Sequence, residues 1–209
     1  MTTKIIIVRH GETAWNVENR FRGSQDIPLN ETGLAQAKAV SRRLASEKIG
    51  AVYSSRLQRA MKTAEIIAAP HGLTAIASDG LSNINYGEME GRLISDIAQQ
   101  LPEFYRALMQ TPHLVQFPGG DTLDALTSRS VASLHEMIAH HPNETIVAVT
   151  HQVVTRVLIC ALLGLDNSHH WEISQDTCCI NVFRYRKGRF IVDQLNDTCH
   201  LLFPNWREP

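Results

Sequence analysis

Unbroken apolar runs at the start of the chain and near its end predict two buried strands. "KIIIV", residues 4–8, is short and β-branched, which is typical of a strand covered on both faces. "TIVAVTH", residues 145–151, has the same character and ends in a histidine. The shorter runs "AVY" and "LTAIAS", residues 51–53 and 73–78, indicate further strands. "CCINVFRYRKGRFIVDQLN" predicts a late hairpin that turns at its Lys-Gly pair, residues 187–188.

Apolar positions at helical spacing separate these strands. Residues 29–50 carry Leu34, Ala37, Val40 and Leu44 on one helical face, and Gly50 is the expected C-terminal cap. Residues 54–72 predict a second helix that begins at a cap on Ser54 or Ser55 and is stopped by Pro70 and Gly72. Two later helices are expected over residues 121–141 and 152–165.

The middle of the chain, about residues 79–121, has a different composition. Its glycines and prolines include Gly87, Gly91, Pro102, Pro112, Pro118, Gly119 and Gly120. A single helix is expected inside it, over about residues 94–109. We interpret this stretch as a cap-like excursion from one domain spanning residues 1–209, not as a second domain.

Strands that alternate with helices predict an α/β fold with three layers. Its central sheet should be mainly parallel, with helices on both faces and the helical excursion over the active site. In such sheets ligands bind beyond the carboxyl ends of the strands. His10 follows one predicted strand and His151 follows another. We therefore expect these two histidines, far apart in the sequence, to share one crevice.

Composition narrows the choice of partners. The chain has 209 residues, 44% of them apolar, and a formal net charge of −1, so neither nucleic acid nor an anionic membrane is an expected partner. Any site for an anion must be local. There is no apolar stretch of signal-peptide or membrane-spanning length. The four cysteines, Cys160, Cys178, Cys179 and Cys199, lack metal spacing and are interpreted as reduced thiols of a cytoplasmic protein.

Four side chains that follow or flank the predicted strands suit phosphate chemistry. Arg9, His10, Arg59 and His151 are expected to form a compact positive pocket. A guanidinium group matches phosphate oxygens, and a neutral imidazole is a good nucleophile whose pKa neighbouring cations lower. The chain has no G-x-x-x-x-G-K-[ST] loop, which argues against nucleotide-driven transfer by that route.

Several ordered blocks of this sequence resemble the histidine phosphatase, or phosphoglycerate mutase-like, superfamily. They are "VRHGETAWN", "FRGSQDIPLNETGLAQA", "YSSRLQRAMKTAEIIA", "GEMEG", "GGDTL" and "VTHQ". The compact middle region is similar to the phosphatase branch. "PHLVQFPGGDTL", "CALLGLD" and "LNDTCHL" are similar to the metal-independent phosphoserine phosphatases.

The resemblance implies a role for each matching residue. His10 would attack the phosphoryl group and become phosphohistidine, while Arg9 and Arg59 grip its oxygens and His151 stabilises the transferring group. Asn16 would donate a hydrogen bond to a phosphate oxygen. Arg22, Asn83 and Gln152 complete the expected substrate-binding set. No metal and no cofactor are expected.

The sequence departs from the family pattern at Asn83. A glutamate that protonates the leaving oxygen usually stands there, and an amide cannot act as a general acid, a role worth about 10²–10⁴-fold. One alternative is that another acid protonates the leaving oxygen, with Glu88 the candidate. A second is that the leaving group needs little protonation. A third is that the protein is a slow or altered enzyme, or a binding protein. Arg22 replaces a frequent glutamine. It would meet a second anionic group of the substrate, or lie in an exposed loop.

Three functions remain open at this point. The favoured one is a metal-independent phosphomonoester hydrolase acting on a small phosphorylated metabolite, with phosphoserine the leading substrate. The alternatives are a phosphoglycerate mutase and a phospholigand-binding protein with weakened catalysis. The sequence does not fix the oligomeric state, although the apolar late hairpin offers an edge for a homodimer.

Overall fold

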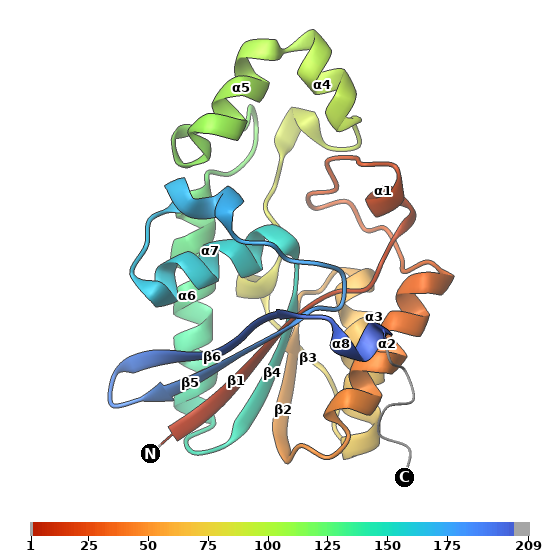
Figure 1. Cartoon of the computed structure of the whole chain (residues 1–209), viewed down its shortest axis with the longest axis vertical. Coiled ribbons are helices and arrows are strands. Elements are labelled where there is room, and N and C mark those ends of the chain that lie inside the picture. Colours follow the sequence, from red (N-terminus) through yellow and green to blue (C-terminus); the bar gives the residue numbers. More distant parts are fainter. Residues whose placement is uncertain (1, 203–209) are drawn as a thin grey trace.

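The central sheet has a mainly parallel topology. The computed structural model describes residues 2–202, and within them six strands lie in the order β3-β2-β4-β1-β5-β6. Strands β3, β2, β4 and β1 run parallel to one another, while β5 pairs antiparallel with β1 and forms a hairpin with β6 at one edge (Figure 1). The strand bounds are β1 Thr2–Arg9, β2 Ile49–Ser54, β3 Ile76–Ala77, β4 Thr145–Thr150, β5 Ile180–Arg186 and β6 Arg189–Asp197. The expected α/β fold with a mainly parallel sheet is confirmed.

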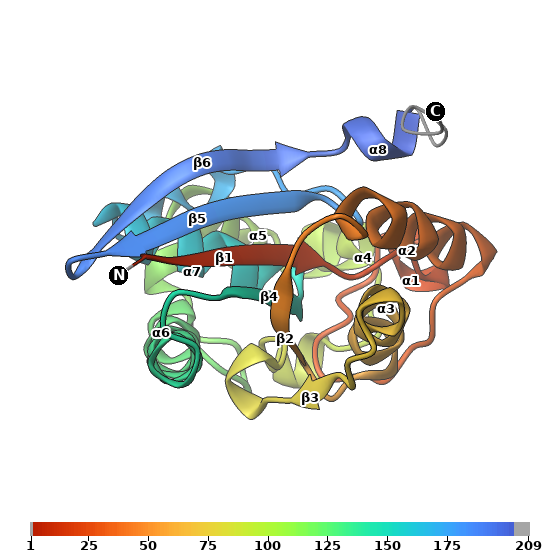
Figure 2. The ribbon, with the colours of Figure 1, turned by 90° about the horizontal axis from the view of Figure 1, so that it is seen from below.

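Helices cover both faces of this sheet, which explains why β1 is apolar throughout. Side chains alternate between the faces of a strand, so Ile5 and Ile7 join one buried cluster and Ile6 and Val8 join another. Figure 2 shows α6 and α7 on one side of β1 and α2 and α3 on the other. The helix bounds are α1 Ala14–Val17, α2 Glu31–Leu44, α3 Gln58–Ala68, α4 Ile94–Gln100, α5 Pro102–Gln110, α6 Leu123–His140, α7 Gln152–Leu163 and α8 Cys199–Leu202. None of the helices within residues 2–202 has the length and hydropathy needed to cross a membrane.

Short polar signals set several helix ends. The Asn30 side chain accepts a hydrogen bond of 2.8 Å from the Gly33 amide at the start of α2, and Thr122 caps α6 in the same way. Gly164 ends α7 in the left-handed conformation, with a φ of 74°. The hairpin turns at Lys187 and Gly188, as predicted, and both have positive φ.

Two predicted caps and one predicted helix are wrong in detail. Gly50 lies inside β2 and does not cap α2, which ends at Leu44. Leu57, not Ser54 or Ser55, occupies the cap position of α3. The single helix expected over residues 94–109 is two helices, α4 and α5, because Pro102 begins a new helix and disfavours the helical conformation at Leu101.

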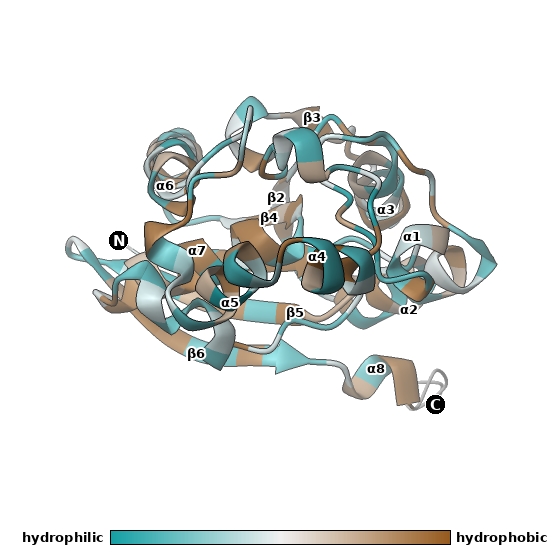
Figure 3. Cartoon of the chain, turned by 90° about the horizontal axis from the view of Figure 1, so that it is seen from above, coloured by the Kyte–Doolittle hydropathy of each residue, from teal (hydrophilic) through white to brown (hydrophobic). Residues whose placement is uncertain are grey.

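The middle excursion lies over the carboxyl ends of the parallel strands. In Figure 1 α4 and α5 stand apart from the sheet, and Figure 3 shows them crossing above it when the molecule is seen from that end. Its apolar side chains continue the cluster on the α6 and α7 face: Leu81, Ile84, Met89, Ile97, Leu108, Val115 and Phe117 are all buried there. The excursion therefore shares a core with the sheet.

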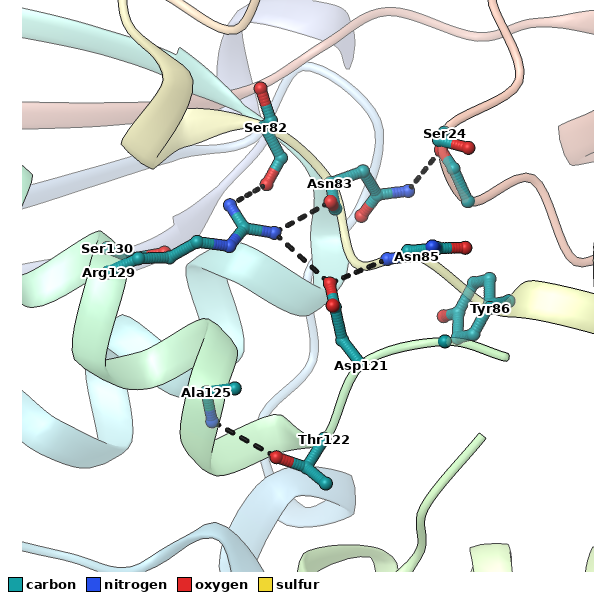
Figure 4. A network of polar contacts seen from close by, with 12 residues as sticks. Ser24, Ser82, Asn83, Asn85, Tyr86, Asp121, Thr122, Ala125, Arg129 and Ser130 are labelled. Carbon is teal, nitrogen blue, oxygen red and sulfur yellow. Dashed lines mark hydrogen bonds and ion pairs between the residues drawn. The ribbon is translucent and has the colours of Figure 1, made fainter. Parts of the chain in front are cut away.

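Side chains at the start of α6 hold the first part of the excursion in place (Figure 4). Arg129 donates hydrogen bonds of 2.7 Å to the Ser82 carbonyl and 2.8 Å to the Asn83 carbonyl. Asp121 accepts from the Asn85 amide at 3.0 Å and lies 3.6 Å from the Arg129 guanidinium. Residues 82–85 are thus fixed by contacts to a long helix that packs on the sheet.

The loop after β1 is clamped against α2 by two glycines. A Cβ atom placed on Gly33 would lie 2.7 Å from the Glu12 nitrogen, and one placed on Gly11 would lie 2.9 Å from the Gly33 Cα. The Glu12 carbonyl accepts from the Asn30 amide at 3.0 Å, and the Gly11 amide donates to the Thr63 hydroxyl at 3.2 Å. The segment that carries His10 is therefore held by both α2 and α3.

Candidate active site

A cavity of about 250 Å³ opens where β1 and β4 end. Its floor includes His10 and His151, the residues that follow these two strands. Its walls come from the loop after β1, the excursion, α7 and the segment after α7. The lining residues are His10, Arg20, Phe21, Arg22, Asn83, Tyr86, Ile94, Tyr105, Leu108, Met109, His151, Gln152, Val153, Arg156 and Trp171.

The two histidine rings face each other, with centroids 5.1 Å apart and planes inclined by 61°. Nδ1 of His10 lies 2.6 Å from the Gly11 carbonyl oxygen, so Nδ1 carries the proton and donates it to that carbonyl. Nε2 of His10 then holds the free lone pair. Because His10 lines the cavity, this nitrogen is the atom that can attack an electrophile there.

Both imidazoles are neutral at ordinary pH. Burial lowers the pKa of His10 well below its usual value, and the charges of Arg59 and Arg9 lower it further. Burial also lowers the pKa of His151, again with Arg59 next in importance. Nε2 of His151 lies 2.9 Å from the Ser55 hydroxyl, while its Nδ1 is buried without a hydrogen-bond partner in the described chain.

Two buried guanidinium groups supply the positive charge. Arg59 is fully buried in α3 and donates hydrogen bonds of 2.6 Å to the Gln25 carbonyl and 2.9 Å to the Gly23 carbonyl. Arg9 ends β1 and donates to the Gln175 carbonyl. Burial lowers the pKa of each guanidinium to about 10, with repulsion from Arg22 the next cause, so both stay charged at neutral pH.

This arrangement favours an anion. Burying two arginines beside two neutral histidines costs free energy unless a negative group meets them. The Nε atoms of Arg9 and Arg59 are buried without a partner among the described residues. Neither Arg9 nor Arg59 is itself a lining residue of the cavity, and both act on it from behind the two histidines. The lining residues within 2–202 include Arg20, Arg22 and Arg156 but no aspartate or glutamate. A tetrahedral oxyanion held beside the His10 Nε2 matches both the charge and the nucleophile.

Comparison with known proteins agrees with this geometry. The profile described as "Histidine phosphatase superfamily (branch 1)" matches residues 5–198. The chain belongs to the histidine phosphatase superfamily. Two curated proteins and one solved structure show which phosphatases and related proteins it resembles.

Phosphoserine phosphatase 1 of Hydrogenobacter thermophilus is 37% identical over 198 residues, which cover 95% of this chain and 94% of that protein. Phosphoglycerate mutase-like protein 4 of Arabidopsis thaliana is 41% identical over 202 residues, covering 95% of this chain and 86% of that protein. Among solved structures, a mutant of phosphoserine phosphatase from Entamoeba histolytica in complex with phosphoserine superposes with a TM-score of 0.85. That structure is 27% identical in sequence, and the match covers 95% of this chain and 99% of the other.

The remaining predicted residues of this histidine phosphatase fall into two groups. Arg22, Asn83 and Gln152 line the cavity. Arg22 is half-buried, so the reading of an exposed loop arginine is wrong. Asn16 does not line the cavity: its Oδ1 accepts from the Thr13 amide at 3.0 Å and hydroxyl at 2.8 Å, which caps α1. Its role toward phosphate stays a prediction.

Glu88, the candidate acid, is placed away from the cavity. It lies in a short turn of helix at Gly87–Met89, is exposed, and is not among the lining residues. The expectation that Glu88 reaches the leaving oxygen is therefore not supported by its position. Asn83 does line the cavity, and its Nδ2 donates a hydrogen bond of 3.0 Å to the Gly23 carbonyl while its Oδ1 is buried without a partner in the described chain.

Sequence reasoning missed most of the lining residues, among them Arg156, Tyr86 and Trp171. Arg156 had a readable signal, because it is the lone charged residue of the apolar helix α7 and lies four positions after Gln152, on the same face. Its guanidinium stacks on Trp171, 5.0 Å from the ring centroid. Trp171 carried no such signal, since it reaches the cavity from an irregular segment, residues 167–172.

The residues that the structure describes form no cluster of metal-binding side chains. Across residues 2–202, no three side chains of histidine, cysteine, aspartate or glutamate are gathered as a metal site. His135 packs against the rings of Tyr185 and Phe190. Independence from metals stays a prediction, as does the homodimer.

Proposed function

We propose that this histidine phosphatase hydrolyses phosphoserine through a phosphohistidine formed on His10, without a metal. The observation that carries the proposal is the neutral His10 ring, whose Nδ1 is committed to the Gly11 carbonyl and whose Nε2 is free. A nucleophile held in one tautomer beside fixed cations needs no reorganisation when charge develops on phosphorus.

The proposed reaction has two steps. The His10 Nε2 attacks phosphorus in line as the bond to the leaving oxygen breaks, with Arg9, Arg59 and His151 stabilising the phosphoryl oxygens. Water then attacks the phosphohistidine and releases inorganic phosphate, which restores the neutral ring.

Support for phosphoserine comes from the relatives and from charge. The 37% identical protein and the similar solved complex both carry phosphoserine in their names. Arg22 and Arg156 line the cavity beyond the two histidines, where they would face the substrate carboxylate. A cytoplasmic location stays a prediction.

The test is phosphate release from phosphoserine, phosphoglycerates and sugar phosphates, together with labelling of the protein. We expect phosphoserine to be turned over fastest and an acid-labile phosphoryl group to form on the protein. His10→Ala should abolish both, with circular dichroism as the control for folding. Label that persists in His10→Ala would refute His10 as the nucleophile.

A mutase is the second candidate, because a relative at 41% identity is named phosphoglycerate mutase-like. It predicts that a bisphosphate primer is required and that phosphate is retained on carbon compounds. A binding protein predicts retention of phosphorylated ligands with no phosphate release. The same panel, run with and without primer, separates all three.

A further inference from the structure

Among residues 2–202, no carboxyl group lines the cavity to protonate a leaving oxygen. Its lining includes Asn83 but neither aspartate nor glutamate, and Glu88 is exposed outside it. Glu90 does not line the cavity either, and its carboxylate is engaged as an acceptor: the Ser24 amide donates to it at 2.7 Å and the Gln25 side chain at 2.9 Å. An alkoxide cannot leave readily without a proton, so another group is needed.

Among the lining residues, few others can give up a proton at neutral pH. The arginines hold theirs, and the two histidines are neutral because burial and neighbouring cations lower the pKa of each. Two phenols remain, Tyr86 and Tyr105. Tyr86 lies three residues after Asn83 on the segment that Arg129 and Asp121 hold in place (Figure 4).

The Tyr86 ring is rigidly placed. It packs edge-on against Phe21, with centroids 4.9 Å apart, and against Phe117 at 4.8 Å. Its amide donates to the Glu90 carboxylate at 3.2 Å. The hydroxyl makes no hydrogen bond to the described part of the chain and is left for a ligand in the cavity.

The surroundings of Tyr86 suit a group that loses and regains a proton. Burial raises the pKa of its phenol, so the proton is held at neutral pH, while the nearby Arg22 and Arg156 oppose this shift. Both arginines line the same cavity. A phenolate formed during the reaction would therefore be stabilised by two cations. Tyr105 lies on α5, where its partly buried ring packs against the apolar cluster.

We propose that Tyr86 is the general acid of this enzyme, replacing the carboxyl group that Asn83 lacks. The inference rests on the proposed phosphatase function. As the His10 Nε2 forms its bond to phosphorus and the bond to the ester oxygen breaks, the Tyr86 hydroxyl gives its proton to that oxygen, and the alcohol leaves. The phenolate then takes a proton from the attacking water. The new oxygen–phosphorus bond displaces His10, and phosphate departs with Tyr86 protonated again.

The test compares two esters in Tyr86→Phe. Phosphoserine and 3-phosphoglycerate leave an alkoxide, which needs a proton, whereas p-nitrophenyl phosphate leaves a stable anion, which does not. We expect kcat on the alkyl esters to fall by about 10²-fold or more. Turnover of p-nitrophenyl phosphate should stay within about threefold, which also shows that the variant is folded. Tyr185→Phe, on β5 and outside the cavity, is the matched control and should spare both kinds of ester. Tyr105→Phe tests the other phenol of the cavity, and an alkyl-ester loss larger there than in Tyr86→Phe would overturn the assignment.

A second variant asks whether the lost function is acid catalysis. Asn83→Glu in the Tyr86→Phe background places a carboxyl group at the cavity and should restore at least a tenfold part of the alkyl-ester activity. Equal loss on both kinds of ester in Tyr86→Phe, or no loss on either, overturns the proposal. If the unmodified protein releases phosphate from no ester, or His10→Ala still does, the proposed function itself fails instead.

Discussion

Replacing Gly33 by alanine tests how closely the nucleophile loop depends on α2. Gly33 is the third residue of that helix, where alanine is ordinarily favoured over glycine by about 0.8–1.0 kcal/mol. Propensity alone therefore predicts a more stable protein. The added Cβ, however, would lie 2.7 Å from the Glu12 nitrogen and closer still to the Glu12 carbonyl oxygen.

The contact between this Cβ and the Glu12 backbone decides whether the substitution stabilises or destabilises the protein. Both atoms that the Cβ meets belong to the backbone, which cannot rotate away as a side chain can. To reach the 3.4 Å of an ordinary contact, the Glu12 segment must move by about 1 Å. Overpacking of this kind costs about 1–3 kcal/mol, which exceeds the gain from propensity. Taking a cost of about 2 kcal/mol and subtracting the gain leaves a net loss of about 1 kcal/mol, which lowers the melting temperature by about 2–4 °C in a domain of this size.

The effect on catalysis should be larger than the effect on stability. Glu12 is two residues from His10, and a misplacement of about 1 Å at the reacting group costs about 10²-fold in rate. We expect kcat to fall by that factor at a temperature where Gly33→Ala is fully folded, as judged by circular dichroism. Thr32→Ala is the control, since Thr32 is exposed on the same turn. A Gly33→Ala protein with unchanged kcat and an equal or higher melting temperature would refute the reasoning.

Four further outcomes are expected. Burial and the charges of Arg59 and Arg9 lower the pKa of His10 well below 6.5, so its active neutral form persists as pH falls. The acid limb of kcat/KM should therefore follow the second ionisation of the ester, about pH 6 for an alkyl phosphate. An acid limb with the same midpoint for p-nitrophenyl phosphate would contradict this. Arg22→Met should raise KM for phosphoserine at least tenfold and leave phosphoethanolamine, which has no carboxylate, nearly unchanged; equal effects on both would argue against a carboxylate contact. Asn30→Ala removes the cap of α2 and should lower the free energy of unfolding in urea by about 1 kcal/mol, whereas Asn30→Ser should retain most of it. Prolonged treatment with a chelator should leave phosphate release unchanged, and recovery of a lost activity on adding a metal would show the metal-free mechanism to be wrong.

The burial of β1 and β4 was predictable because each strand contains an unbroken apolar run. Ile5 through Val8 are apolar on both faces, and β4 has the same pattern, so the meeting of His10 and His151 in one crevice followed from the parallel-sheet rule. The role of Arg59 as a phosphate ligand came from the family resemblance, since nothing in its spacing relates it to a strand that ends at Arg9. Its full burial could not have been read from a helix of mixed composition.

The walls of the cavity were less predictable, because tertiary contacts place them. Tyr86 lies in an irregular segment whose position depends on Arg129 and Asp121, and no periodicity encodes such contacts. The break between α4 and α5 did have a local signal in Pro102, which the apolar pattern outweighed. Glu88 illustrates the opposite error: proximity in sequence to Asn83 did not place its side chain at the cavity.

The position of β1 in the sheet has a consequence for biosynthesis. Both of its neighbours, β4 and β5, begin after residue 144, so the first strand leaves the ribosome long before either partner exists. At translation speeds of about 5–20 residues per second, that wait lasts on the order of 10–35 s. During it, an apolar segment with two open edges is exposed to other chains. Premature termination anywhere before the final hairpin should therefore yield aggregating fragments and not a smaller working enzyme.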